Sequence, residues 1–219
     1  MRTISSVLLL MVTLLGFAQP KKVTELIQLT GQSKLELAFD FADQIDFKVW
    51  DKQEVLVEVT VEIDNGEHND IFTMTSYISS ETITVEMDDQ LWDKLPGNKN
   101  RDWNCNHSSR IDYLVYLPKD LEVSASTING DYEFEFFGQP MELKTISGAI
   151  DISIPASTGL DFSARTISGE VYSDLEIQYP EGKEGLRKIV GQDFKGRING
   201  GGTLSLLETI SGNIYLRKG

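Results

Sequence analysis

Hydrophobic and polar residues alternate along most of this chain, and a period of two is typical of β-strands with one buried face. The alternation is clearest from 34 to 63, where apolar side chains fall at every second position of successive runs. A polar turn at 51–54 separates two of these runs, and the pattern resumes at 71–88 and 111–116. We therefore predict many strands and almost no helix. The best helical candidate, 181–189, is short and holds two glycines.

A four-residue motif recurs inside this β pattern, which is typical of a repeat architecture. Segments 127–130, 145–148, 166–169 and 209–212 read Thr-Ile-Asn-Gly or Thr-Ile-Ser-Gly, each between two alternating arms. Glycine permits a sharp bend, and Ser or Asn beside it can bond a nearby amide. We expect each isoleucine to fill the interior beside the bend, so that stacked corners make an internal column next to one of threonines. The predicted structural corners are Ile128, Gly130, Ile146, Gly148, Ile167, Gly169, Ile210 and Gly212.

The spacing of the corner glycines is irregular in one place. Successive corners are 18, 21 and 43 residues apart, and the last gap is close to twice the others. This predicts a diverged copy inside the gap. Gly200 falls there, but it lies too near Gly212 to complete a repeat, so the pattern does not assign it to a corner.

The pattern predicts an all-β fold, a short right-handed β-solenoid or β-roll of about 20-residue repeats. We expect a single domain over 19–219. Its N-terminal strands, 22–118, cap or extend the stack and carry an inserted loop at 89–108. The repeat region is 119–219. One unit alone cannot bury its apolar face, so each needs a neighbour above and below.

The first 18 residues have the pattern of a secretory signal peptide. Arg2 precedes a short apolar run from Val7 to Phe17, and small residues stand before a cleavage point after Ala18. The run is too short for a membrane-spanning helix. We therefore predict export to the periplasm, the cell surface or the medium.

The chain is acidic, with a formal net charge of −14. This argues against nucleic acid and disfavours anionic lipid as partners. The single cysteine, Cys105, cannot form an internal disulfide. Cys105 and His107 lack visible further metal ligands, and the chain has only two histidines, so we predict no metal, no cofactor and no serine-hydrolase triad.

The repeats resemble those of the DUF4097 family, bacterial β-strand repeat proteins named as adhesins. The likeness rests on the corner motif, on the run Ile198-Asn199-Gly200-Gly201-Gly202 and on the segment 45–55 around Trp50, and it spans about residue 30 to the end. The resemblance implies a β-solenoid or β-roll and export to the envelope. It brings no catalytic residues. The loop 89–108 lies outside the repeat pattern.

Aromatic residues in and beside the loop are the candidate ligand-binding residues: Trp92, Trp103 and Tyr113. They suit sugar stacking, and functional insertions are often loops. The alternative is that the tryptophans cover an open end of the stack. Oxygen side chains at 64–70 suit Ca²⁺, but the Asn-Gly pair there favours a plain hairpin loop.

We predict a non-catalytic binding or scaffold module, adhesin-like, whose partner is a glycan or an envelope protein, with self-association also open. Two other classes remain. Paired carboxylates such as Asp151 and Glu170 suit a carbohydrate-active enzyme, although alternation already requires polar residues at these positions. Exposed strand edges suit an envelope-stress or assembly factor that pairs with a protein.

Overall fold

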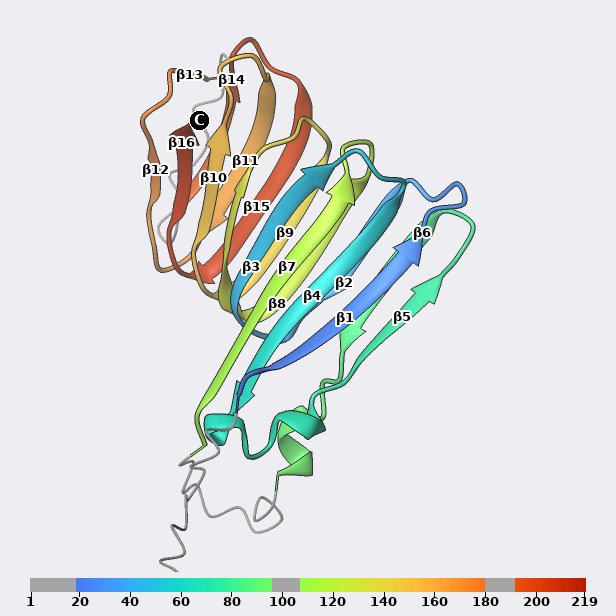
Figure 1. The fold of residues 1–219 in the computed structure, drawn as a ribbon. Coiled ribbons are helices and arrows are strands. Elements are labelled where there is room, and N and C mark those ends of the chain that lie inside the picture. The colour runs from blue at the N-terminus through green and yellow to red at the C-terminus, as the bar shows by residue number, and fades with distance from the viewer. Residues whose placement is uncertain (1–18, 96–106, 180–191) are drawn as a thin grey trace, which may run out of the picture.

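The computed structural model describes residues 19–95, 107–179 and 192–219, and their regular structure is almost entirely β (Figure 1). No α-helix occurs among these residues, which confirms the all-β prediction. Three short 3-10 helices span Asp64–Gly66, Asn69–Ile71 and Leu91–Lys94. The strands are β1 (Lys21–Gln28), β2 (Lys34–Ala38), β3 (Phe41–Trp50), β4 (Glu54–Ile63), β5 (Met74–Ile78), β6 (Thr82–Met87), β7 (Ser109–Pro118), β8 (Glu122–Glu135), β9 (Met141–Ser147), β10 (Ile150–Ile154), β11 (Leu160–Thr166), β12 (Val171–Ser173), β13 (Ile177–Gln178), β14 (Gln192–Ile198), β15 (Thr203–Ser211) and β16 (Ile214–Lys218).

Two rows of strands share the long strand β8. Its first half pairs with β2 and β9, and its second half pairs with β3 and β10. The entry row, which includes the strands leading into the corners, runs β5-β6-β2-β8-β9-β15-β11-β14-β13. The exit row, which holds the strands leaving the corners, runs β1-β4-β7-β3-β8-β10-β16-β12. The sheet stays open, with β1 and β13 at the two ends of its longest path.

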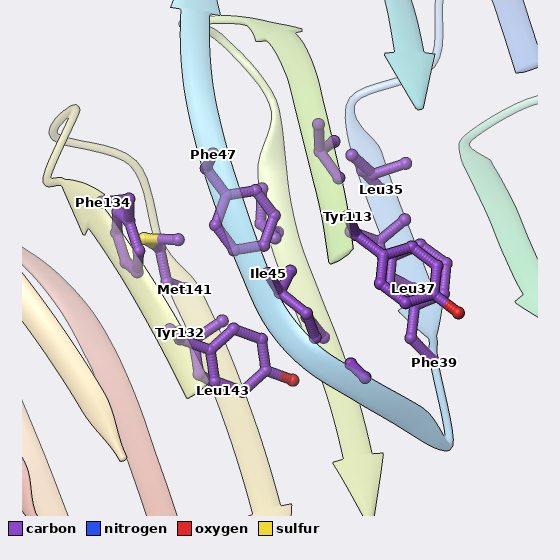
Figure 2. Close-up of a cluster of buried hydrophobic side chains, with 14 of the residues drawn as sticks. Leu35, Leu37, Phe39, Ile45, Phe47, Tyr113, Tyr132, Phe134, Met141 and Leu143 are labelled. Carbon is purple, nitrogen blue, oxygen red and sulfur yellow. The ribbon is translucent and has the colours of Figure 1, made fainter. Parts of the chain in front are cut away.

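The core lies where the inward faces of the two rows meet. Alternating residues of β4, from Val55 to Ile63, are fully buried, as period-two patterning requires. Figure 2 shows entry-row side chains such as Leu35 and Leu143 in one cluster with exit-row side chains such as Ile45 and Tyr132. The Tyr132 hydroxyl joins the rows directly, because it donates to the backbone oxygen of Lys144 at 3.1 Å.

The corners stack in space in an order that differs from their order in the chain. Thr127 is in register with Thr145, Thr145 with Thr209, and Thr209 with Thr166. The last repeat of the chain, β15 and β16, therefore lies between the β9–β10 repeat and the β11–β12 repeat (Figure 1).

This order explains the long gap between the third and fourth corners. The described part of the gap holds β13 and β14, and β14 runs antiparallel to β11, unlike a corner arm. The predicted diverged copy is therefore wrong for the described residues. Gly200 lies in a turn between β14 and β15, with φ of +85°. There the chain reverses and returns to fill the place beside β9.

The corner isoleucines lie outside the structure, and the threonines lie inside it. Thr127, Thr145, Thr166 and Thr209 are at most 5% exposed. Ile128, Ile146, Ile167 and Ile210 are 41%, 47%, 40% and 42% exposed. The predicted stacking occurs, but the prediction that isoleucine fills the interior is wrong. Alternation continues through the corner, so adjacent Thr and Ile must point to opposite faces.

Candidate functional site

The described residues of the predicted aromatic site, Trp92 and Tyr113, do not form a shared surface for a ligand. The ring of Tyr113 is 1% exposed and stacks on Phe39 with 4.0 Å between centroids, and its hydroxyl donates to the backbone oxygen of Phe41 at 3.2 Å. Burial raises the pKa of this phenol. A ring held in the core cannot stack on a ligand, so the interpretation of Tyr113 as a binding residue is wrong.

The two tryptophans of the predicted site have different outcomes. Trp92 is partly buried against the core and meets Phe41 edge-on, with ring centroids 5.2 Å apart. This contact gives Trp92 a packing role against Phe41. Trp103 and Cys105 lie outside the described residues.

The loop at 64–72 brings both histidines of the chain to one carboxylate. His107 Nδ1 lies 2.7 Å from Asp64 Oδ2, and His68 Nε2 lies 3.7 Å from the same oxygen. The backbone N–H of Ser108 donates to Asp64 Oδ1 at 2.9 Å. Within the described residues no group of three or more His, Cys, Asp and Glu is arranged to hold a metal ion. The bonds from Asp64 to His107 and to the N–H of Ser108 tie this loop to the segment that leads into β7.

The residues three positions after the corner glycines form a line on the outer face of the exit row. The third residue after each corner glycine is Glu133, Asp151, Tyr215 or Tyr172, in the spatial order of the strands. Each is in register with the next. The line thus changes from acidic on β8 and β10 to aromatic on β16 and β12.

Tyr172, Tyr215, Arg217 and Asp151 form an aromatic cluster at this end of the exit row. The two rings stack with centroids 5.3 Å apart and planes 11° apart. The guanidinium carbon of Arg217 lies 4.8 Å from the centroid of Tyr215. Arg217 Nε is 2.7 and 2.8 Å from the two oxygens of Asp151. The hydrogen bond to Asp151 raises the pKa of Arg217, so the guanidinium stays charged.

Further polar groups hold the rings of the aromatic cluster in place. The Tyr172 hydroxyl bonds Glu170, and this bond raises the pKa of Tyr172. Asn213 Nδ2 donates to the Tyr215 hydroxyl at 3.0 Å. A shallow hollow of about 340 Å³ lies over the cluster and also touches Ser173, Asp174 and Leu216. The side chains are thus fixed before any ligand arrives, which lowers the entropy cost of binding.

This arrangement suits recognition of a flat, hydroxyl-rich ligand. Aromatic faces pack against the apolar face of a ring, while planar charged groups bond hydroxyls around its rim. It suits acid–base catalysis less well. Both oxygens of Asp151 are held by Arg217, and Glu170 is bonded to Tyr172, so the two carboxylates proposed for an enzyme serve as supports.

Sequence reasoning missed the aromatic cluster because Tyr172 and Tyr215 are 43 residues apart and look like ordinary strand residues. The repeats do contain a sequence signal for this pair of tyrosines. Alignment on the corner glycines places both tyrosines at the same position, three residues after Gly169 and Gly212. The missing information was that the two repeats are neighbours in space.

No family model matches this chain, and no curated protein matches its sequence. Among solved structures, it is similar to a candidate cell adhesion protein from Clostridium sporogenes, with a TM-score of 0.58 and 13% identity over 92% of this chain and 100% of the other. At this identity the likeness shows the fold alone.

Two other solved structures align with much lower scores. One is a candidate adhesin from Parabacteroides merdae, with a TM-score of 0.24 and 12% identity over 70% of this chain and 69% of the other. The second is a candidate lipid binding protein from Parabacteroides distasonis, with a TM-score of 0.26 and 10% identity over 90% and 96%. These TM-scores are too low to support an argument. Among the described residues, no helix has both the length and the apolar character needed to span a bilayer.

Proposed function

We propose that this protein is an exported, non-catalytic, adhesin-like binding module, built as a short β-solenoid, that holds a glycan at its aromatic cluster. The predicted signal peptide supports placement in the periplasm or at the cell surface. The fold shared with the candidate cell adhesion protein is compatible with a display role, although fold by itself does not determine function.

The observation that carries the proposal is the fixed geometry of Tyr172 and Tyr215. Tyr172 is 46% exposed, yet its hydroxyl and ring both have partners within the protein. A large aromatic side chain held at the surface is typical of a recognition site, since rigid rings supply contact area at low entropic cost. Arg217 supplies N–H donors for hydroxyl groups of the ligand.

The test is a glycan array followed by calorimetry of the strongest ligand. Each aromatic contact contributes about 0.5–1.5 kcal/mol, so we expect the double variant Tyr172→Ala/Tyr215→Ala to weaken binding about tenfold or more. The matched control is Tyr77→Ala, which removes a 57% exposed tyrosine from the entry row. It should bind like the wild type.

Three results would contradict the proposal. Equal affinity of the wild type and the double variant would show that the ligand binds elsewhere. Cleavage of a polysaccharide that is lost in Asp151→Asn or Glu170→Gln would favour the carbohydrate-active enzyme instead. Capture of one specific protein by the wild type, without glycan binding, would favour the assembly factor.

A further inference from the structure

Four half-exposed isoleucines form a continuous apolar line on the outer face of the entry row. The isoleucine ladder, as we name Ile128, Ile146, Ile210 and Ile167, crosses β8, β9 and β15 and ends at the residue that follows β11. Their register follows from the paired threonines before them. Isolated exposed apolar residues are ordinary, but a contiguous line of them marks a contact surface.

A row of charges lies beside the isoleucine ladder, two residues earlier on each strand. In spatial order this charge row is Ser126, Lys144, Glu208 and Arg165. The Arg165 guanidinium pairs with Glu208 at 3.4 Å, and a bond to Glu142 raises the pKa of Lys144, with Glu208 adding to the effect. Opposite charges therefore occupy the two middle strands, β9 and β15.

We propose that the isoleucine ladder and the charge row are the interface of a symmetric homodimer. The two-fold axis lies parallel to the strands, between β9 and β15. This axis reverses the order of strands but keeps their direction, so Ile146 faces the second copy's Ile210 and Ile128 faces its Ile167. In the charge row, Lys144 faces the second copy's Glu208.

Charge complementarity favours a second copy as the partner. An isologous interface must complement itself under the two-fold rotation. The middle positions meet this requirement, because Lys144 of each copy faces Glu208 of the other copy, which gives two contacts between opposite charges. At the outer positions Ser126 faces Arg165, so no like charges meet anywhere in the row. An unrelated partner would not require this alternation.

The surface also has the shape for insertion of an apolar side chain. A hollow of about 300 Å³ lies between the ladder and the charge row, and it is lined by Ile128, Ile146 and Ile210 with Lys144 and Glu208 beside them. A partner isoleucine can enter it. Because the aromatic cluster lies on the exit row, the dimer leaves it uncovered and would present two ligand sites, which raises avidity. The inference itself does not depend on the glycan.

The first experiment measures the association state of the purified protein by sedimentation velocity across a concentration series. We expect a dimer for the wild type and at least about 100-fold weaker dimerisation for Lys144→Glu, because this change places two acids together at both middle positions. The charge-swapped double variant Lys144→Glu/Glu208→Lys should dimerise again. Ile146→Thr, a change to another β-branched residue, should be monomeric with an unchanged circular dichroism spectrum.

The second experiment tests the axis by cross-linking, in a chain whose Cys105 is replaced by alanine. Ser126 and Arg165 are three strands apart in one copy, about 14 Å. In the proposed dimer they face each other across about 10 Å, the usual separation of packed sheets, which is too far for a direct disulfide but within reach of a short bifunctional thiol cross-linker. Ser126→Cys mixed with Arg165→Cys should therefore give a cross-linked dimer with such a reagent, whereas Ser126→Cys alone, whose two thiols are displaced by three strands, should not.

Several outcomes would overturn the proposal. A wild type that stays monomeric at high concentration shows that the ladder serves a different partner. A dimer that survives Ile146→Thr uses another surface. If the swapped variant folds but stays monomeric, or Ser126→Cys cross-links to itself, the axis is wrong.

Discussion

At the scale of single residues, the corner motif is explained by a ladder of threonine–glycine contacts. Thr209 Oγ1 donates to the backbone oxygen of Gly148 at 3.0 Å, and Thr166 Oγ1 donates to that of Gly212 at 2.9 Å. Each of these two threonines thus bonds the corner of the neighbouring repeat, whereas Thr127 bonds the backbone oxygen of Asn129 in its own corner. Isoleucine at this buried position would leave the carbonyl without this partner, at a cost of roughly 1–3 kcal/mol.

The corner glycines are required mainly by close backbone approach. Gly130 has φ of +140°, as the predicted bend suggests, but no left-handed φ occurs at Gly148, Gly169 or Gly212. A Cβ on Gly212 would lie 1.9 Å from the backbone oxygen of Gly148, and one on Gly169 would lie 1.8 Å from that of Gly212. The motif therefore records how tightly successive corners stack.

Gly212→Ala should lower the free energy of unfolding by about 1–3 kcal/mol or more, because the new methyl group must push two backbones apart. The matched control is Ser211→Ala, an exposed neighbour in the same corner, which should change it by less than about 0.5 kcal/mol. Urea denaturation of both variants measures the difference. Equal midpoints would show that the corner relaxes freely.

The contacts between stacked corners also explain why the prediction that isoleucine fills the interior was wrong. Alternation shows that one of Thr209 and Ile210 points inward, and hydrophobicity favours the isoleucine. The interior at the corner holds carbonyl groups of the adjacent repeat, which require a donor. A hydrogen-bond requirement set by a distant segment is not visible in the local pattern.

At the scale of elements, the loop between β4 and β5 is anchored through Asp64. Burial acts to raise the pKa of this carboxyl, but hydrogen bonds from His107 and the N–H of Ser108 outweigh it, and the net pKa is lowered from 3.8. Asp64 has φ of +52°, an uncommon conformation for a residue other than glycine. The side-chain bonds help to hold the loop in that conformation.

The lowered pKa of Asp64 makes the fold sensitive to acid. A depressed carboxyl pKa in the folded state gives stability that is present above 3.8 and is lost as the pH falls through the folded-state pKa. We expect the urea midpoint of the wild type to fall between about pH 5 and pH 2 more steeply than that of Asp64→Asn. Asp70→Asn, at an exposed carboxylate of the same loop, is the control and should follow the wild type. Parallel curves for wild type and Asp64→Asn would contradict this role.

Most elements of the N-terminal half were predictable from the chain alone. The runs at 34–63 became β2, β3 and β4, with the turn at 51–54 between the last two. Local alternation and turn residues determine these strands. The aromatic cluster was not predictable in this way, because its tyrosines meet only through the pairing of β12 with β16.

At the scale of the whole molecule, strand order is the feature that the sequence did not reveal. The repeats suggest a stack built in chain order, yet β15 lies between β9 and β11, and β16 lies between β10 and β12. Period-two patterning tells which face of a strand is buried but not which neighbour it pairs with. Alternation alone therefore could not predict that β15 pairs with β9 and β11.

This order makes the C-terminal segment an interior part of the stack, in contrast to most chain ends. A chain that stops after Gly202 loses β15 and β16 and leaves four strand edges, on β9, β11, β10 and β12, without partners. It also removes the buried Leu207, Ile214 and Leu216. We expect this truncated chain to lose cooperative unfolding in the repeat region.

Removal of residues 19–29 is the matched control, since β1 pairs with β4 alone. This deletion should preserve the repeat region, as judged by circular dichroism and proteolysis. In the intact chain, amide hydrogen exchange should be slower in β15, which is bonded on both sides, than in the edge strand β1. If β15 exchanges faster than β1, or the chain ending at Gly202 unfolds as cooperatively as the full chain, the last repeat is not held between its neighbours.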